Sequence, residues 1–351
     1  MSRDALIAAG ESMSAFDPTP MPDSLAMCLK PYEQLVPGCN LETELRQEVA
    51  GYGRVGLVGG IGSGKSGVSR YALGGPGLGM IALNVVTEDR EKIATVRGFL
   101  EILVSQLLSR ATVASRLSGE VRERLLASSA PTEPLPRTEI RTRAELGGAL
   151  WLLNGGVARE VTRTLGGSES YRSTQDLRQA AREALEAISA SDVAPVLLAD
   201  DTDRLLAVAG DDAQGDALFR GFFGEVLREI AEQLECGLVI AIHDRYRERD
   251  DYAGFTAGRI TTKEIPRLTE PHQLAQIIDR RGEFVDPPVS CEELLTEAGL
   301  HRLTAIHTSE PAGGLRATLS IFHQALGLAI SDGSSSIDER HLTAADTLAG
   351  G

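Results

Sequence analysis

Four short apolar runs in the first two thirds of the chain predict buried strands. Runs without alternation of polar and apolar residues are typical of parallel sheets covered on both faces. They lie at 55–58, 79–86, 196–199 and 238–242. Between them, apolar residues that recur every three or four positions predict helices, as at 96–108 and 173–189. This alternation predicts an α/β fold with a three-layer αβα core and a parallel sheet.

The C-terminal pattern is helical throughout and predicts a small all-helical domain. We expect Thr269 to cap its first helix and Gly282 to end it. Ser290 and Glu293 have the spacing of a capping box at the start of the next helix.

The chain is therefore expected to have three parts. Residues 1–50 form a proline-rich arm that ends in a short helix, 51–267 form the core, and 268–351 form the helical domain. Within the core, periodicity weakens at about 118–175, which predicts an insertion.

The stretch GGIGSGKSG fits two phosphate-binding patterns at once. As G-x-x-x-x-G-K-[ST] it is a P-loop, with the residues Gly59, Gly60, Ile61, Gly62, Ser63, Gly64, Lys65, Ser66 and Gly67 in or next to it. As G-x-G-x-x-G it would bind a dinucleotide, but that pattern needs an acidic residue at the end of the next strand, where Val86 lies. Only the P-loop gives Lys65 a role at the terminal phosphates and Ser66 a role at Mg²⁺. We therefore expect ATP and Mg²⁺ as cofactors.

Two carboxylates follow the apolar run at 196–199. P-loop enzymes need a carboxylate at the end of a neighbouring strand to orient Mg²⁺, and often a second to polarise water. We assign Asp200, together with Ser66, to the metal and Asp201 to the attacking water. Capping of the following helix is the alternative role for these aspartates.

Two further polar residues, His243 and Asp244, follow the run at 238–242. Because ligands of open α/β sheets bind beyond the carboxyl ends of the strands, one of them could contact the γ-phosphate or the water. We take His243 as the catalytic candidate, with a purely structural role as an equal alternative.

Composition and charge reduce the number of protein classes to which the chain could belong. The formal net charge of -15 excludes a generally basic surface that coats nucleic acid. Four scattered cysteines without a C-x-x-C pair indicate neither a zinc site nor a disulfide framework. The N-terminus has no signal pattern and no run approaches 18 apolar residues, so we expect a cytoplasmic protein without a membrane partner.

The order of the P-loop, LLADD at 197–201 and a polar-ended strand at 243 resembles that of AAA+ ATPases. RITTKEIPRLTEPHQLAQIIDRR, which starts at Arg259, is similar to the passage from the ATPase core into the helical lid of the origin-recognition (initiator) clade. GGLRATLSIFHQALGLAISDG resembles the G-x-x-R helix of that lid.

The resemblance implies roles for two arginines. Arg316 would sense the γ-phosphate from the lid, and Arg259 would act as an arginine finger on ATP bound to a neighbouring subunit. Arg245, Arg247 and Arg267 are competing candidates for the finger. Because a finger works only across a subunit boundary, it implies a homo-oligomer. The clade also implies DNA as a partner.

Three departures from the clade keep an alternative open. The acidic pair is Asp200-Asp201 rather than Asp-Glu, the sensor 1 position holds His243 or Asp244 rather than Asn, Ser or Thr, and the sequence ends where a winged-helix domain would begin.

The leading hypothesis is an oligomeric AAA+ ATPase that couples nucleotide state to assembly on nucleic acid or on a protein partner. The alternative is a low-turnover, nucleotide-gated switch that controls a protein effector, such as a nuclease in a bacterial defence module. A P-loop small-molecule kinase is a third hypothesis, which does not account for the helical domain.

Overall fold

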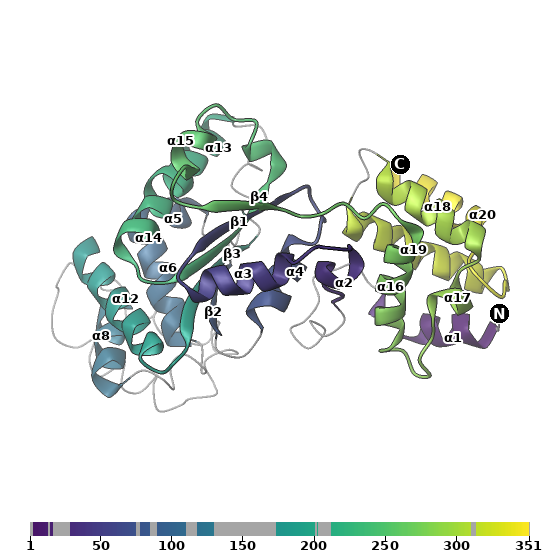
Figure 1. The fold of residues 1–351 in the computed structure, drawn as a ribbon, viewed down its shortest axis with the longest axis horizontal. Helices are drawn as coiled ribbons and strands as arrows, with labels where there is room; N and C mark the ends of the chain where they lie inside the picture. The colour runs from purple at the N-terminus through teal and green to yellow at the C-terminus, as the bar shows by residue number, and fades with distance from the viewer. Residues whose placement is uncertain are drawn as a thin grey trace, which may run out of the picture. The chain divides into compact units, whose positions relative to one another are not determined.

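The computed structural model describes residues 3–12, 15–16, 29–74, 78–84, 90–109, 118–129, 173–200, 202, 212–309 and 314–350. The chain divides into two compact units, drawn in Figure 1. Unit 1 consists of 1–76, 239–254 and 260–351, and unit 2 of 77–238 and 255–259.

A five-stranded parallel sheet has the order β2-β3-β4-β1-β5. The strands are β1 (Arg54–Gly59), β2 (Leu78–Asn84), β3 (Ala194–Asp200), β4 (Gly237–His243) and β5 (Thr261–Glu264). The interior positions of β1, β3 and β4 are buried, as their continuous apolar runs predict. The three-layer prediction of a parallel sheet with helices is confirmed.

The edge strand β5 has no counterpart in the hydrophobic pattern. Its four residues, TTKE, are polar and mostly exposed, and it pairs with β1 in the register Val55↔Thr261 to Val58↔Glu264. An edge strand needs no buried face of its own, and charged residues such as Lys263 are common on edges. Hydropathy alone therefore did not predict it.

Unit 1 contains helices from both ends of the chain. Its N-terminal helices are α1 (Arg3–Glu11), α2 (Tyr32–Leu35), α3 (Leu41–Ala50) and α4 (Lys65–Leu73). After β4 come the short 3-10 helix η6 (Asp244–Tyr246) and α15 (Tyr252–Thr256), which runs into unit 2. Its C-terminal helices are α16 (Pro271–Gly282), α17 (Cys291–Leu294), α18 (Glu297–Thr308), α19 (Leu315–Ser331) and α20 (Glu339–Gly350).

The first helix, α1, packs on α17 and α19, although the sequence pattern assigned residues 1–50 to an arm with a helix only at its end. Leu6 and Ala9 of α1 are fully buried. Phe16, also fully buried, contacts Phe322 of α19 with ring centroids 5.3 Å apart. The beginning of the chain is therefore part of the same apolar core as the C-terminal helices.

The cap of α16 differs from the prediction by one residue. Glu270, not Thr269, is the N-cap, and Gln273 accepts hydrogen bonds from the backbone N–H groups of both. Pro271 at the first helical position fixes this start because its ring presets a helical φ. The predicted end at Gly282 and the capping box of Ser290 and Glu293 are confirmed.

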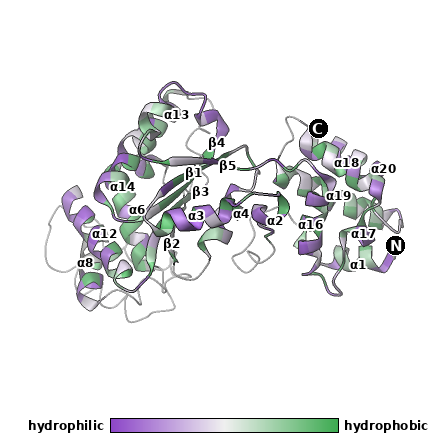
Figure 2. Cartoon of the chain, viewed as in Figure 1, coloured by the Kyte–Doolittle hydropathy of each residue, from purple (hydrophilic) through white to green (hydrophobic). Residues whose placement is uncertain are grey.

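Unit 2 surrounds β2 and β3 with helices that carry apolar faces. They are α5 (Arg90–Ile93), α6 (Val96–Ser109), α8 (Gly119–Ser129), α12 (Thr174–Ser189), α13 (Asp212–Phe219), the π-helix η5 (Arg220–Val226) and α14 (Leu227–Gln233). Helix α12 begins with a capping box between Ser173 and Asp176 and packs on α6, α8 and β3. Figure 2 shows hydrophobic colour on the strands and both colours on the helices around them. Most of the predicted insertion lies outside the described residues.

Candidate functional site

The predicted P-loop joins the end of β1 to the start of α4. Gly62 has a φ of +74° and Gly64 a φ of +97°, in the left-handed region that side-chain-bearing residues rarely adopt. Gly64 is also the N-cap of α4, so the turn and the helix start share one residue. These two glycines explain why the sequence folds here as a tight loop that leads directly into a helix.

Lys65 is the first residue of α4, and its side chain folds over the loop. Its Nζ donates hydrogen bonds to the carbonyl oxygens of Gly59 and Gly60, each at 2.7 Å. Ser66 follows as the second residue of the helix. Ile61 projects from the loop with 63% of its surface exposed. The lysine and the hydroxyl therefore lie on the first turn of a helix whose N-terminus faces the loop.

The start of α19 lies against the P-loop. The backbone N–H of Arg316 donates to the carbonyl oxygen of Gly62 at 3.3 Å. A Cβ on Gly62 would come within 3.0 Å of the Arg316 Cβ, and a Cβ on Gly314 within 2.4 Å of the Ile61 carbonyl oxygen. Glycine at 62 and 314 is therefore required by the close approach of two backbones. The structure brings the predicted sensor Arg316 beside the predicted P-loop, with its side chain exposed.

The N-termini of two helices thus lie at one loop. Helix α4 follows the loop directly in sequence, and α19 comes from the C-terminal part of unit 1. Each N-terminus carries a partial positive charge and unsatisfied N–H groups. Their fields add at the glycine loop, which makes the loop a favourable place for an anion.

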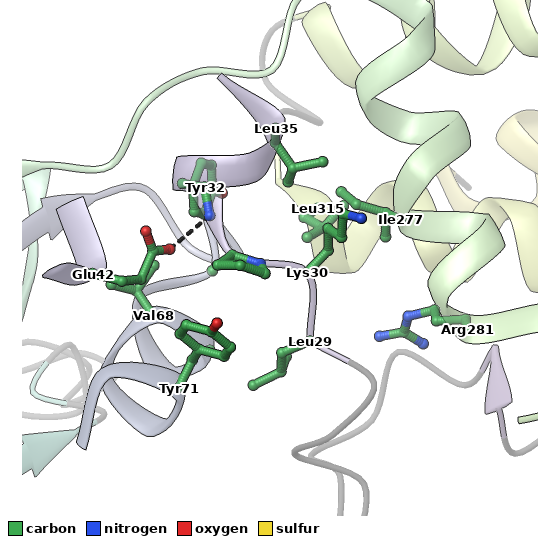
Figure 3. Close-up of a pocket in the computed structure, with 13 residues that line it drawn as sticks. Leu29, Lys30, Tyr32, Leu35, Glu42, Val68, Tyr71, Ile277, Arg281 and Leu315 are labelled. Carbon is green, nitrogen blue, oxygen red and sulfur yellow. Dashed lines mark hydrogen bonds between the residues drawn. The ribbon is translucent and has the colours of Figure 1, made fainter. Parts of the chain in front are cut away.

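A pocket next to the P-loop is lined by residues of the N-terminal segment, α4, α16 and α19 (Figure 3). Its apolar lining comes from Leu29, Leu35, Val68, Ile277 and Leu315, and its aromatic and polar lining includes Tyr32, Tyr71, Glu42 and Arg281. Gly64 and Gly67 of the glycine stretch also line it. The pocket therefore offers a largely apolar surface directly beside a candidate phosphate site.

Tyr32 joins this pocket to the P-loop. Its hydroxyl donates to the Ser63 carbonyl oxygen at 2.7 Å, and its backbone N–H donates to Oε1 of the buried Glu42 at 2.7 Å. Burial, and then the charge of Glu42, raises the pKa of the Tyr32 phenol above its usual value. The phenol consequently stays protonated and keeps its role as a donor to the loop.

The end of β4 supplies a second polar group beside the loop. Oδ2 of Asp244 lies 3.7 Å from the position that a Cβ on Gly60 would take. Nδ1 of His243 accepts the backbone N–H of Arg245 at 3.1 Å and lies 2.5 Å from Oδ1 of Asp244. Asp244 is therefore placed close to the P-loop, with the imidazole of His243 beside it.

The other predicted site residues lie elsewhere. Asp200 is the last residue of β3 in unit 2, paired in register with Asn84 of β2. Asp201 lies outside the described residues. Arg259 also belongs to unit 2, where its Nη1 donates to the Phe255 carbonyl oxygen at 2.7 Å.

The competing arginines differ in their surroundings. Arg245 is exposed, and its backbone N–H is bound to the His243-Asp244 pair. Arg247 forms an ion pair with Glu264 at the edge of the sheet. Arg267 lies in the segment between β5 and α16. Each of these three residues belongs to unit 1.

The parallel sheet carries a glycine loop between β1 and α4, which is the strand–loop–helix arrangement of a P-loop. The sequence matches no known family model and no curated protein. Solved structures similar to the chain include origin-recognition proteins, the class that the sequence resembles.

Among them are two from Aeropyrum pernix. The ORC2 protein in its ADP form has a TM-score of 0.46 and 13% identity, over 95% of this chain and 72% of that one. The ORC1 protein in complex with DNA has a TM-score of 0.45 and 15% identity, over 90% of this chain and 68% of that one.

The Drosophila ORC bound to DNA has a TM-score of 0.46 and 15% identity, over 96% of this chain and 65% of that one. Likeness at this level carries no argument about the site.

No helix in the described ranges combines the length and apolar character that a membrane crossing requires. Within the same ranges, no three His, Cys, Asp or Glu side chains gather where they could hold a metal ion.

Tyr32, Glu42 and Arg281 were not predicted as site residues. They lie in segments that hydropathy describes only as a proline-rich arm and a helix of the C-terminal domain. Nothing in their local sequence marks them, because only the packing of the N-terminal segment between α4 and α16 brings them to the pocket.

Proposed function

We propose that the chain is a cytoplasmic ATPase that binds ATP at the P-loop and couples its nucleotide state to assembly on nucleic acid or on a protein partner. The observation that carries the proposal is the loop at Gly62 and Gly64, in left-handed conformation, with Arg316 of the helical part bound to it through the backbone. A loop of this shape at a helix N-terminus turns its N–H groups toward an anion.

The triphosphate would lie in the loop. Backbone N–H groups of the glycine stretch and the Lys65 ammonium would bind the β- and γ-phosphates. Arg316, on the first turn of α19, lies near enough to the loop at Gly62 for its exposed side chain to reach a terminal phosphate. It would do so from within the same subunit.

The base would occupy the neighbouring pocket. Apolar side chains such as Leu29, Val68 and Ile277, together with Tyr32 and Tyr71, offer flat and apolar surfaces to a ring. Glu42 and Arg281 give the pocket acceptor and donor groups. Because α4, α16 and the N-terminal segment all line it, a base held there would contact three separate parts of the chain.

For magnesium we propose the hydroxyl of Ser66 and the carboxylate of Asp200 as ligands, because Mg²⁺ prefers oxygen ligands and P-loop sites leave most of its shell to phosphate and water. Bound Mg²⁺ supplies charge neutralisation of the phosphates. Asp201 is proposed to orient the attacking water.

We further propose that the protein acts as a homo-oligomer on DNA or on a protein partner. Arg259 would supply positive charge to ATP on a neighbouring subunit, and it would have to leave the Phe255 carbonyl oxygen to do so. Such a shared site makes hydrolysis depend on assembly.

The first prediction is that Lys65→Ala abolishes ATP binding, because the terminal phosphates lose their ammonium partner. Binding of a fluorescent ATP analogue to the purified chain measures this. Lys92→Ala, at an exposed position of α5, is the matched control and should bind like the parent. Equal binding by the parent and by Lys65→Ala would disprove the proposed function.

Turnover should then be measured against protein concentration, with and without duplex DNA. Specific activity that rises with concentration and rises again with DNA is the expected result, since Arg259 acts across subunits. Binding of ATP with turnover no higher than that of Lys65→Ala would instead favour the nucleotide-gated switch that controls an effector.

A further inference from the structure

The first turn of α19 carries Arg316 and lies against the P-loop. The backbone N–H of Arg316 donates to the carbonyl oxygen of Gly62 at 3.3 Å, and Gly314 at the N-cap lies against Ile61. Further along, the helix is buried in the C-terminal core through residues such as Phe322. An interaction that ties the first turn to that core therefore affects where the Arg316 side chain begins.

Thr318, two residues after Arg316 and 1% exposed, makes such an interaction. Its hydroxyl donates to the carbonyl oxygen of Gly314 at 3.2 Å, and the same hydroxyl oxygen lies 2.8 Å from Nδ1 of His307 on α18. A bond from threonine back to the carbonyl oxygen four residues earlier is common in helices, and Thr304 of α18 makes one. Thr318 differs because its hydroxyl also contacts a neighbouring helix.

The protons of these groups follow from their number. A threonine hydroxyl has one proton and donates to one acceptor only. Both contacts are hydrogen bonds at once when Thr318 donates to Gly314 and the Nδ1–H of His307 donates to Thr318. Burial lowers the pKa of His307 below its usual value, so the ring is neutral at pH 7 and keeps one proton for this bond.

We propose that Thr318 and His307 are positioning residues for Arg316, an inference that rests on the proposed function. The bond to His307 holds the first turn of α19 on α18, and the bond to Gly314 holds the residue that abuts the loop. Arg316 lies between Gly314 and Thr318 in sequence, so the pair sets where its side chain leaves the helix. Because only ATP has a γ-phosphate for Arg316 to reach, the pair acts on ATP binding and not on ADP binding.

The test is Thr318→Val, which keeps the shape of the side chain and removes the hydroxyl. The dissociation constant for the β,γ-imido analogue of ATP should rise about fivefold, the effect of one lost hydrogen bond. The dissociation constant for ADP should not change. His307→Phe keeps a ring without Nδ1 and should give the same result, and Thr318→Ser, which keeps the hydroxyl, should bind like the parent.

Two further variants serve as controls. Thr304→Val removes a buried hydroxyl that, within the described ranges, bonds only to its own helix, at the Leu300 carbonyl oxygen, and it should change neither affinity. In the Arg316→Ala background, Thr318→Val should weaken binding of the ATP analogue no further, because the residue through which it acts is gone.

The outcomes separate the inference from the proposed function. A parental ratio of ATP-analogue to ADP affinity in both Thr318→Val and His307→Phe would overturn the inference and leave the proposed function intact. Equal weakening of both nucleotides, together with a lower melting temperature, would show a merely structural role and overturn it too. A parent chain that binds neither nucleotide would overturn both the inference and the proposed function.

Discussion

At the scale of single residues, the end of β4 shows how a short helix decides which side chain faces a site. His243 ends the strand, and η6 begins immediately at Asp244. The turn into this 3-10 helix directs Asp244 to Gly60, and His243 accompanies it through Nδ1. Both side chains are held by one donor, since the Arg245 backbone N–H donates to Nδ1 of His243 and to Oδ1 of Asp244.

The role of His243 in this turn can be tested with two substitutions. Alanine removes the Nδ1 that accepts the Arg245 backbone N–H, so turnover should fall about tenfold, the effect of losing about 1.5 kcal/mol of a hydrogen bond beside the P-loop. Asparagine offers an amide oxygen as the acceptor and should restore most of the activity. Steady-state kinetics together with ATP affinity measure the effect, and affinity should not change in either variant.

A merely structural role for His243 predicts a different pattern. In that case His243→Asn would be as inactive as His243→Ala, or both would lose stability together with activity. Thermal melting of the two variants separates this outcome from the expected one.

Sequence reasoning reached most, but not all, of this residue-level picture. The glycines at 62 and 64 were predictable because a P-loop pattern specifies left-handed backbone. The choice between His243 and Asp244 was not, because both follow the same apolar run and the start of η6 sets their directions. Tyr32 and Glu42 depend on contacts between residues 10 and 31 positions apart in the chain, which periodicity does not encode.

At the scale of elements, α19 links the P-loop to the C-terminal core. Its N-cap Gly314 touches Ile61, while Phe322 and Leu326 are fully buried further along the same helix. Its apolar stripe was predictable from spacing. Its contact with the loop was foreseen only through the resemblance to the G-x-x-R helix.

Two glycines of α19 form a matched pair for testing this contact. Gly314→Ala would place a Cβ 2.4 Å from the Ile61 carbonyl oxygen, so the helix start must move away from the loop. We expect ATP affinity to fall about tenfold, within the cost of about 1–3 kcal/mol for overpacking. Gly327→Ala lies in the helix interior, where an added Cβ meets nothing within 4 Å.

The control variant Gly327→Ala should leave affinity unchanged and raise stability by up to about 1 kcal/mol, since alanine favours helix more than glycine does. Titration with a fluorescent nucleotide and thermal melting measure both effects. If Gly314→Ala binds ATP as tightly as the parent, the contact between α19 and the loop has no role in binding.

At the scale of the whole molecule, the N-terminal segment ties together parts of unit 1 that are distant in sequence. Gln273 of α16 donates to the Leu35 carbonyl oxygen at 3.1 Å, and Arg281 donates to the Ala15 carbonyl oxygen at 3.0 Å. Tyr32 binds the P-loop from the same segment. The beginning of the chain thus contacts both the P-loop and the C-terminal helices.

Phe16 should therefore matter for folding more than its place near the terminus indicates. Phe16→Ala removes a fully buried ring beside Phe322, and we expect a loss of about 3–5 kcal/mol in the free energy of unfolding. Ile7→Ala, on α1 at a position with 41% exposure, should change it by less than about 0.5 kcal/mol. Urea unfolding measures both, and equal, small effects would contradict the packing described here.

The overall α/β class followed from alternating apolar runs and helical periodicity. Helix α1 and its packing did not, because the sequence pattern assigned residues 1–50 to an arm with a helix only at its end, and α1 packs on α17 and α19 far along the chain. The edge strand β5 was not predicted either, because only its pairing with β1 defines it. Both elements are determined by partners that lie far along the chain.

Because Gly314 contacts the P-loop, a movement of the loop would tilt the whole of α19. Its 17 residues give a rod of about 25 Å, held at one end by the loop and overlaid further along by α1, whose Gly10 lies against Ile330. A tilt of about 5° at the loop would displace the far end by about 2 Å, enough to misalign close-packed side chains. A fluorescent dye attached to α1 should therefore change its emission when an anion binds at the P-loop end of α19.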